Sequence, residues 1–395
     1  MGLIPISLVL FLHIFGLIVS TSPLHAQAKV FNVVNYGAKA NDKTDNSAVF
    51  LKVWNAACEE EGKKEILIPA GVFRTGPVKM NGPCKGQMLF NNRGVLRAPS
   101  DPQLQVREWI TFQYIDGLTV HGLGTFDGQG AYSWSYKKTS KYLVLPDTLR
   151  FHFVNNSMVH HLRLIDSKGI HMMFYGCYNI YVDHIHISAP GDSPNTDGIH
   201  IALSSNIHIS YSTIGTGDDC IALLSGARNV NVSHVNCGPG HGISVGSLGN
   251  TQGEEDVTGL LVQSCMFTGT LNGVRIKTWA NPSFPLTASS FTFQDLIMNN
   301  VYNPIIIDQE YSDLSTYPEQ GSSQVQIRDV KYINIRGNSM SQVAINFLCS
   351  EFKPCQNLEL NNINLDYHGR GGPAKADCTF ANGVAYGTQN PPSCL

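Results

Sequence analysis

Asn179-Ile180-Tyr181-Val182 is one copy of a pattern that recurs as Asn156-Ser157-Met158-Val159, Asn206-Ile207-His208-Ile209 and Asn229-Val230-Asn231-Val232. Each copy places an asparagine before alternating apolar positions, which is typical of a short β-strand with one buried face. Successive asparagines lie 23, 27 and 23 residues apart, and a near-constant step indicates a repeat architecture. Looser copies are Gly117-Leu118-Thr119-Val120, Asp256-Val257, Ser290-Phe291-Thr292-Phe293, Gln326-Ile327-Arg328-Asp329-Val330 and Asn357-Leu358-Glu359-Leu360.

About nine units of 22 to 35 residues, each with short strands and polar turns, predict an all-β fold, a right-handed parallel β-helix. Each coil would bury its inward side chains on its neighbours, and the recurring asparagines would hydrogen-bond to one another along the axis. A leucine-rich repeat would need a leucine consensus that is absent here, and a β-propeller would need longer units.

The chain before residue 116, where the repeat sets in, predicts three elements. Residues 31–34 resemble a short strand, and Ile66-Leu67-Ile68 resembles a buried strand that Pro69-Ala70-Gly71 ends. Between them Asp45 can cap a helix over residues 46–60. Its apolar positions follow the helical period at Phe50, Leu51, Trp54, Ala57 and Cys58. We expect this short helix to cap the N-terminal end of a single domain that spans residues 29–395.

The composition and the first residues of the chain indicate where the protein acts. Charged residues are only 14% of the 395, the net charge is −3, and no run rich in Lys or Arg is present, which argues against nucleic acid as a partner. Residues 2–20 are almost wholly apolar and Ala26-Gln27-Ala28 follows, so residues 1–28 are predicted to be a secretory signal peptide. The alternative is a transmembrane anchor. We expect a secreted monomer of the extracellular space or cell wall, without a membrane span after cleavage.

Ten cysteines in a secreted chain predict disulfides. Pairing neighbours along the chain predicts Cys58–Cys84, Cys220–Cys237, Cys349–Cys355 and Cys378–Cys394. Cys177 and Cys265 are then left as buried thiols, and the spacings do not favour a zinc site. Two sequons predict possible glycosylation at Asn155 and Asn231.

Four polar motifs recur at one place per repeat: Asn195-Thr196-Asp197, Gly217-Asp218-Asp219, Gly240-His241-Gly242 and Arg275-Ile276-Lys277. Three carboxylates on adjacent coils can supply what glycosidic hydrolysis needs, a protonated acid and a carboxylate that activates water. Because clustered carboxylates disfavour one another's ionisation, we expect one of them to keep its proton at mildly acidic pH. His241 could orient that acid or bind substrate.

The two cations of the fourth motif indicate an acidic substrate. Arg275 and Lys277 are two apart, so on a strand their side chains point the same way. Arginine can hold a sugar carboxylate by two parallel hydrogen bonds, and lysine adds a compact charge. The pattern therefore favours a polyanionic sugar over a neutral one.

Each motif also has a simpler interpretation. Asp197 could be a turn residue, Asp218 and Asp219 an Asx turn or half of a calcium site, and His241 an ordinary loop histidine. Arg275 and Lys277 could form a solvated pair that faces Glu254 or Glu255. We interpret nine further histidines as structural: His152, His160, His161, His171, His184, His186, His200, His208 and His234. Only the coincidence of four motifs in register favours catalysis.

At these motifs the chain resembles the polygalacturonases, the pectin-degrading glycoside hydrolases. The similarity extends through Tyr36-Gly37-Ala38, Ile68-Pro69-Ala70-Gly71, the run from Gly122 to Gly130 and Ile307-Asp308-Gln309-Glu310-Tyr311. It implies a right-handed parallel β-helix, in agreement with the repeat. The detail of residues 240–249 and 308–311 is most similar to the plant pollen-type exo-acting branch.

The resemblance also implies roles for individual residues. Asp218 would be the general acid, Asp197 and Asp219 the pair that activates water, and His241 the support of the acid. The residues implied in substrate binding are Asn195, Arg275, Lys277 and Tyr311. The mechanism would be inverting, would need no metal or other cofactor, and would cleave α-1,4 bonds of demethylated polygalacturonate as a galacturan 1,4-α-galacturonidase.

Alternatives remain open at this stage. An endo-acting polygalacturonase, a calcium-dependent pectate lyase and a catalytically silent pectin-binding wall protein would all present a similar scaffold. One departure from the family pattern is Ser312, which stands where a cysteine often follows the tyrosine. It implies a missing local disulfide in the loop of residues 311–323.

Overall fold

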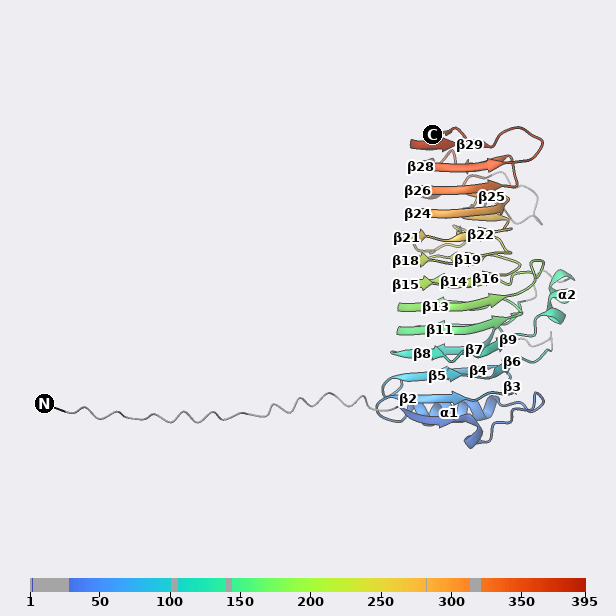
Figure 1. The fold of residues 1–395 in the computed structure, drawn as a ribbon, viewed down its shortest axis with the longest axis vertical. Coiled ribbons are helices and arrows are strands. Elements are labelled where there is room, and N and C mark those ends of the chain that lie inside the picture. Colours follow the sequence, from blue (N-terminus) through green and yellow to red (C-terminus); the bar gives the residue numbers. More distant parts are fainter. Residues whose placement is uncertain (1, 3–27, 101–105, 140–143, 282, 313–320) are drawn as a thin grey trace.

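The computed structural model describes residue 2 and residues 28–395, except residues 101–105, 140–143, 282 and 313–320. The predicted signal peptide lies almost entirely outside the described residues, as does most of the 311–323 loop. Figure 1 shows successive strands stacked one above another as rungs, from blue at the N-terminal end to red at the C-terminal end.

Every pair of neighbouring strands is parallel, so each turn of the chain forms one coil of a right-handed parallel β-helix. One face is a sheet of β4 (Val78–Asn81), β7 (Glu108–Gln113), β10 (Asp147–His152), β12 (Met172–Tyr175), β14 (Ile199–Ala202), β17 (Ile221–Leu223), β20 (Ile243–Leu248), β23 (Asn272–Trp279), β25 (Asn303–Tyr311), β27 (Val343–Leu348) and β29 (Lys375–Thr379). This face is called the catalytic sheet below.

The second sheet wraps the other sides of each coil. Its first strip holds β1 (Lys29–Asn32), β2 (Lys64–Ile68), β5 (Met88–Asn92), β8 (Leu118–His121), β11 (Asn155–Ile165), β13 (Tyr178–Ser188), β15 (Ser205–Ser210), β18 (Arg228–Ser233), β21 (Val257–Gln263), β24 (Leu286–Val301), β26 (Val325–Ser339), β28 (Cys355–Tyr367) and β30 (Ala381–Asn390). Shorter strands β3 (Val72–Arg74), β6 (Val95–Arg97), β9 (Thr125–Asp127), β16 (Thr213–Gly215), β19 (Asn236–Cys237) and β22 (Met266–Thr268) join the far halves of the long ones.

The recurring asparagines all occupy one corner of the coil. Asn156, Asn179, Asn206 and Asn229 have φ between 48 and 57°, a left-handed conformation that asparagine tolerates better than most residues. Asn179 Nδ2 donates to Asn156 Oδ1 at 2.8 Å, which confirms the predicted hydrogen bonding along the axis. The copy assigned to Asp256-Val257 is wrong, because the residue in register with Asn229 is Gly259. Gly259 adopts the left-handed conformation at this corner (φ 76°), so no asparagine marks this copy of the repeat.

The core fills the inside of the coils with apolar side chains in layers. Phe112, Phe151 and Phe174 stack on successive coils, with ring centroids 5.5 and 4.9 Å apart. At the N-terminal end α1 (Ser47–Cys58) lies across the first coils and buries Phe50 and Trp54, while Trp54 Nε1 donates to Asn81 O at 2.9 Å. The predicted capping helix is therefore confirmed.

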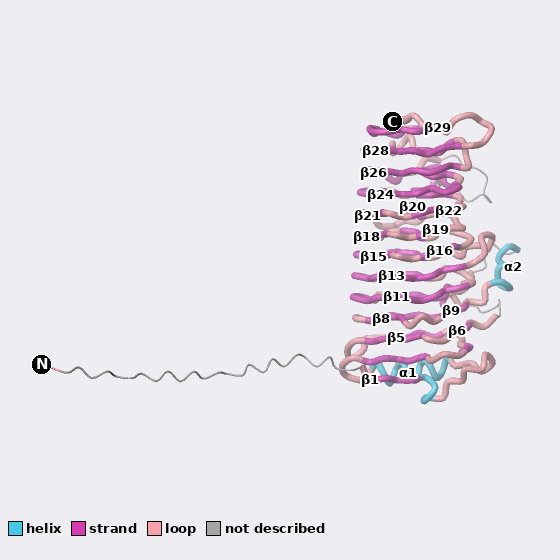
Figure 2. The backbone as a smooth tube through the Cα atoms, in the orientation of Figure 1, coloured by secondary structure: helices cyan, strands magenta, loops and turns pink. Residues whose placement is uncertain are grey.

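The structure corrects the sequence analysis near the N-terminus. The helix is shorter than residues 46–60, and the strand expected at residues 31–34 is β1 followed by a 3₁₀ turn, Val33–Tyr36. The N-cap residue is Asn46, whose side chain makes no capping bond, and Asp45, which was expected to cap the helix, lies one residue earlier and accepts from the Ser47 N–H. Coils also precede residue 116, because β2 pairs with β5 and β5 with β8. A second helix, α2 (Ala131–Thr139), lies beside the stack and was not predicted (Figure 2).

Four disulfides join the four pairs of cysteines that the sequence predicted, Cys58–Cys84, Cys220–Cys237, Cys349–Cys355 and Cys378–Cys394. Cys177 and Cys265 are free and buried, again as expected, and burial raises the pKa of each thiol to about 11. Among the described residues no helix is both long and apolar enough to cross a membrane.

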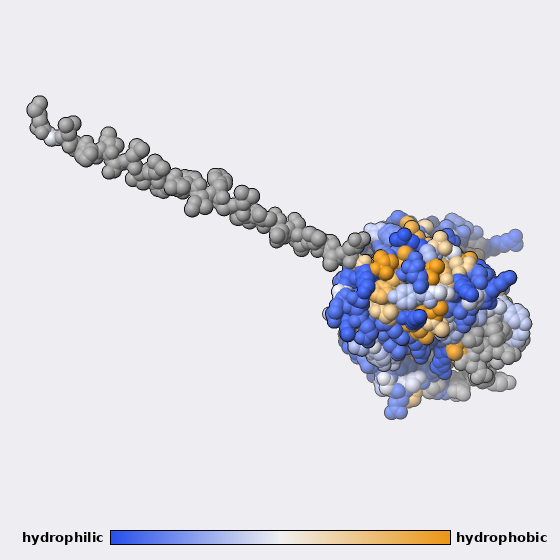
Figure 3. Space-filling model, turned by 90° about the horizontal axis from the view of Figure 1, so that it is seen from below, coloured by the Kyte–Doolittle hydropathy of each residue, from blue (hydrophilic) through white to orange (hydrophobic). Residues whose placement is uncertain are grey.

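Figure 3 looks onto the N-terminal end of the stack, where apolar patches lie among polar residues. Val30 and Val34, in β1 and the turn after it, are 51% and 46% exposed. The apolar interior at this end is covered by α1, which contacts β1, β2 and β4.

Replacing the fully buried Trp54 by alanine should lower the free energy of unfolding by roughly 3–5 kcal/mol, because it opens a cavity between α1 and the first coils. Urea denaturation followed by circular dichroism measures this loss. Phe352→Ala is the matched control, since Phe352 is 75% exposed and its loss should cost less than about 0.5 kcal/mol. Equal costs for the two variants would show that α1 does not stabilise the end of the stack.

Candidate active site

The four polar motifs meet at the edge of the catalytic sheet, midway along the stack. Asn195 and Asp197 precede β14, Asp218 and Asp219 precede β17, and His241 precedes β20. The strands that follow are in register, and β23 continues the series with Arg275 and Lys277. Residues more than 20 apart in sequence therefore stand side by side.

Two glycines allow the loops of the site to pack this closely. A Cβ on Gly217 would lie 2.0 Å from Ser193 O, and a Cβ on Gly242 would lie 2.2 Å from Asn272 O. Gly242 also has φ +88°, where a side chain is strained. Both positions bring one coil's backbone against the next and so fix where Asp218 and His241 point.

Asp218 forms a hydrogen-bonded group with three of the predicted residues. Its Oδ1 lies 2.9 Å from His241 Nδ1 and accepts from the Asp219 N–H at 2.9 Å. Its Oδ2 accepts from Asn195 Nδ2 at 3.2 Å. The Asp218 side chain is 17% exposed and that of His241 34%, so the pair faces the surface of the cleft.

Asp219 is held by the two predicted cations. Arg275 Nη2 lies 3.1 Å from Oδ1 and Lys277 Nζ lies 3.0 Å from Oδ2, while Ser244 Oγ donates to Oδ1 at 2.7 Å. The Asp219 side chain is only 2% exposed. The cations therefore do not face Glu254 or Glu255, because their carboxylate partner is Asp219. Sequence analysis did not foresee this ion cluster or the part of Ser244.

Asp197 has a partner among the histidines that were interpreted as structural. The Nε2 atom of His200 lies 2.9 Å from Asp197 Oδ2, and both side chains are largely buried. Its position, three residues after the motif aspartate and on the next strand, is the only signal that could have found it. His171 does have the expected structural part, because its Nδ1 lies 3.1 Å from the carbonyl oxygens of Thr196 and Asp197.

The surroundings move the pKa values of Asp197 and Asp218 in opposite directions. Burial raises the pKa of Asp197, and the charges of Asp218 and Asp219 add to this, although His200 lowers it. Burial also acts to raise the pKa of Asp218, but the hydrogen bond and charge of His241 and the charge of Lys277 outweigh it and hold the pKa at about 2. Of these two carboxyls, Asp197 is therefore the one more inclined to take up a proton.

The histidines respond in the opposite direction. The hydrogen bond to Asp218 is the largest influence on His241 and raises its pKa. Burial lowers the pKa of His200, but the charge of Asp197 outweighs it, so the pKa is raised overall. At mildly acidic pH the Asp218–His241 pair thus holds one proton, on the histidine side.

An aromatic and acidic group continues the site along β25. Tyr311 contacts Trp279 with ring centroids 5.1 Å apart, and Lys277 Nζ lies 5.4 Å from the centre of the Tyr311 ring. Asp308 is in register with Lys277, and burial raises its pKa. The structure brings Tyr311 into the site as predicted, whereas Asp308 was quoted only as part of a motif.

A cavity of about 250 Å³ adjoins Asn195, Asp197 and His200 on the N-terminal side of the catalytic coil. Lys137 of α2, together with Val144 and the segment after it, forms its far wall. The remaining lining residues are Leu145, Asp147, Lys168, Gly169, Ile170 and Pro194. This wall was invisible to the sequence analysis, because α2 has too weak a periodicity to be recognised.

Asp218, Asp219 and His241 offer ligand atoms within 4.8 Å of one another, a spacing that could hold a metal ion. The donor set argues against it, since Asp219 is already neutralised by Arg275 and Lys277. A divalent cation at this point would be repelled by both. The residues present therefore do not fit a calcium or magnesium site.

A parallel β-helix with carboxylates clustered at one place on its surface is typical of enzymes that cleave polysaccharides. Residues 58–390 match the model of glycosyl hydrolases family 28, and the chain belongs to this family. It is 43% identical over 373 residues to an exopolygalacturonase of Platanus acerifolia, covering 93% of this chain and 98% of that protein. It is 41% identical to a polygalacturonase of Nicotiana tabacum, covering 93% of each. The resemblance found from the motifs is thus confirmed.

Solved structures agree on the fold. The chain matches an exopolygalacturonase from Thermotoga maritima with a TM-score of 0.71 and 17% identity, covering 86% of this chain and 89% of that one. It matches an endo-xylogalacturonan hydrolase from Aspergillus tubingensis with a TM-score of 0.79 and 20% identity, covering 91% and 100%. At these identities the likeness concerns the β-helix alone.

Asp218→Asn should lower the pKa of His241, because the hydrogen bond to Asp218 is the main cause of its rise. Titration of the histidine ring protons by NMR measures the change. Asp295→Asn is the control, since Asp295 is an exposed carboxylate at a corner outside the site and should leave His241 unchanged. A His241 pKa that is the same in both variants would show that Asp218 does not raise it.

Proposed function

We propose that the chain is a secreted polygalacturonase that hydrolyses α-1,4 bonds between galacturonic acids from the chain end, with inversion. The observation that carries the proposal is the pair of opposed groups in one cleft. Asp218 is coupled to a proton-holding histidine, and Asp219 is coupled to two cations. The first can protonate a leaving oxygen, and the second can order water beside an anionic sugar.

Asp218 would act as the general acid, with His241 as its proton reserve. In the free protein the proton of the pair rests on His241. A substrate that covers the pair would remove water and disfavour both charged forms, which raises the pKa of Asp218, lowers that of His241 and draws the proton across the 2.9 Å contact. Asp218 then delivers it to the glycosidic oxygen, and Asn195 keeps the carboxyl oriented through its bond to Oδ2.

Asp197 and Asp219 would hold and activate the attacking water. Both oxygens of Asp219 already accept hydrogen bonds from Ser244, Arg275 and Lys277, so it is a poor nucleophile towards a sugar carbon. That arrangement favours water as the nucleophile and supports inversion at the anomeric carbon. A proton taken by Asp197 would be accommodated, because its pKa is raised.

The cations would have a second task in binding the sugar carboxylate. The contacts of Arg275 to Asp219 and Ser244 engage two of the five N–H donors of a guanidinium. Lys277 can share its three donors between Asp219 and a bound carboxylate. Tyr311 lies beside Lys277 and offers a ring face for the sugar.

Attack from the chain end is supported by the wall that α2 and residues 144–145 form beside Asp197. Lys137, Val144 and Leu145 line the same space as Asn195 and Asp197, and side chains there would favour a terminal sugar over the middle of a polymer. The exopolygalacturonase of Platanus acerifolia is similar over 93% of the chain. An endo-acting enzyme is the second candidate, because the similar tobacco protein is named only a polygalacturonase.

Secretion is supported by the apolar start of the sequence and by four disulfides, which persist in oxidising compartments. Glycosylation at Asn155 and Asn231 stays a prediction, and both side chains are half-buried. The expected single domain from residue 29 to 395, the monomeric state and the cell-wall location belong to the same proposal.

Asp218→Asn should lower turnover on polygalacturonate by roughly 10² or more, because the amide keeps the shape of the side chain but cannot deliver a proton. Reducing-end assays on purified protein measure this loss. Asp295→Asn is again the control and should keep wild-type turnover. Near-normal turnover in Asp218→Asn, with an unchanged circular dichroism spectrum, would overturn the assignment of the acid.

The pH profile should report the proton on His241. Because its pKa is raised above the ordinary 6.5, kcat/KM should persist above that pH and fall as pH rises through the raised value. In His241→Gln, Asp218 alone must hold the proton, so the falling limb should move to lower pH. A limb that stays in place would show that His241 is not the proton reserve.

Arg275→Ala and Lys277→Ala should raise KM far more on polygalacturonate than on its methyl-esterified form, because only the free carboxylate needs the cations. Both should also lower kcat, since Asp219 loses a counter-charge in a buried place. Initial rates on the two polymers test this. Equal effects on KM for both polymers would remove the carboxylate-binding role.

A further inference from the structure

A second corner of the β-helix allows two consecutive side chains to point outward. His161, His184, Tyr211 and His234 occupy it on successive coils, with φ between 46 and 54°. On β11 the buried residues Val159 and Leu162 therefore flank two outward histidines instead of one. The same arrangement on β13 places Asp183 and His184 side by side at the surface.

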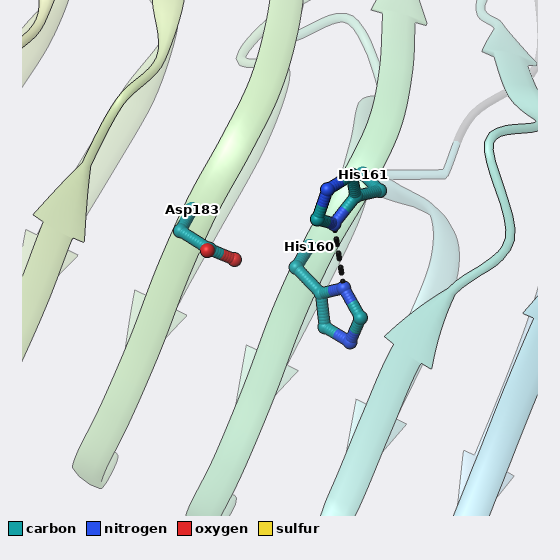
Figure 4. A group of neighbouring side chains, drawn as sticks. All are labelled: His160, His161 and Asp183. Carbon is teal, nitrogen blue, oxygen red and sulfur yellow. Dashed lines mark hydrogen bonds between the residues drawn. The ribbon is translucent and has the colours of Figure 1, made fainter.

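The register of β11 and β13 brings these pairs together. His160 is the partner of Asp183 in the parallel ladder, where neighbouring strands lie about 4.8 Å apart. Figure 4 shows the two imidazoles on one strand and the Asp183 carboxylate reaching toward them from the next. The Nδ1 atoms of His160 and His161 are 2.9 Å apart, and a carboxylate oxygen of Asp183 completes a group whose ligand atoms all lie within 4.8 Å.

Neighbouring rings hold the three side chains in place. His184 stacks on His161 with centroids 4.7 Å apart, and its Nδ1 lies 2.9 Å from Asp183 Oδ2. On the other side His121 stacks on His160 at 5.4 Å. These contacts fix the carboxylate and both imidazoles as outer partners do in metal sites.

We propose that His160, His161 and Asp183 bind a divalent transition-metal ion, with zinc the best match. Two imidazole nitrogens and one carboxylate oxygen are a ligand set of zinc, with water in the open position. Calcium and magnesium prefer oxygen ligands throughout and are a poor match. The site lies on the corner between the strips of the second sheet, away from the catalytic sheet, and is independent of the proposed function.

A metal ion binds an imidazole only in its neutral form, so binding is tested near neutral pH. An ion here would cross-link two adjacent coils and stabilise them by mass action.

Isothermal titration of metal-stripped protein with zinc chloride near neutral pH tests the proposal. Wild type should take up one zinc at this site, and its melting temperature should rise with zinc. His161→Asn, which suits the left-handed corner, and Asp183→Asn should each weaken binding by roughly 100-fold or more, because losing a ligand costs more than losing an outer partner. His234→Asn is the matched control, since His234 occupies the same corner on a later coil and should bind as wild type.

Anomalous scattering from a zinc-soaked crystal then locates the ion. A peak between His160, His161 and Asp183 supports the proposal. It is overturned if zinc binds wild type and the two variants alike, if the control loses binding equally, or if zinc occupies only Asp218, Asp219 and His241. A lack of zinc binding in folded wild type would show that the rings only pack.

Discussion

The in-register pairing of each coil with the next is the constraint on which the rest of the structure depends. A coil cannot bury its apolar residues alone, so it must match the strands above and below. Once Ile221 pairs with Ile243, and Ile243 with Val274, the residues before and within these strands have no freedom to drift apart. The glycines between them admit the close approach of the loops. The register of the sheet thus brings the residues of the active site together, although they are distant in sequence.

The charged neighbours of Asp218 and Asp219 decide what each carboxylate can do. Asp219 is buried with both oxygens engaged by cations or a hydroxyl, and breaking such a pair typically costs about 3–5 kcal/mol. Asp218, one residue earlier, is coupled to a histidine at the mouth of the cleft. Two neighbouring aspartates therefore differ in environment: Asp219 is held by two cations and a hydroxyl, and Asp218 can exchange a proton through His241. Such a difference in environment lets neighbouring carboxylates take different roles.

Much of the fold and most residues of the site could be predicted from the sequence. The contacts between side chains could not, because spacing along the chain does not give distances in space. The asparagine corners marked the coils from residue 116, and their hydrogen bonds are present. The earlier coils at β2 and β5 escaped notice because Lys63 and Gln87 precede these strands, so no asparagine marks them. The four motifs predicted which residues meet. They did not show that Arg275 and Lys277 face Asp219, or that His200 faces Asp197, because residue spacing does not give the directions in which these side chains point.

The most direct test of the account is a proton NMR time course of polygalacturonate with the mature chain, at mildly acidic pH and with chelator present. Viscosity is followed alongside. The account predicts free galacturonic acid from the first minutes, released as the β-anomer, with viscosity barely falling. Early mixed oligomers would keep the hydrolase and reject attack from the chain end, and an α-anomer would reject inversion. Unsaturated products, or no products from folded protein, would contradict the central claim that this cleft hydrolyses the polymer.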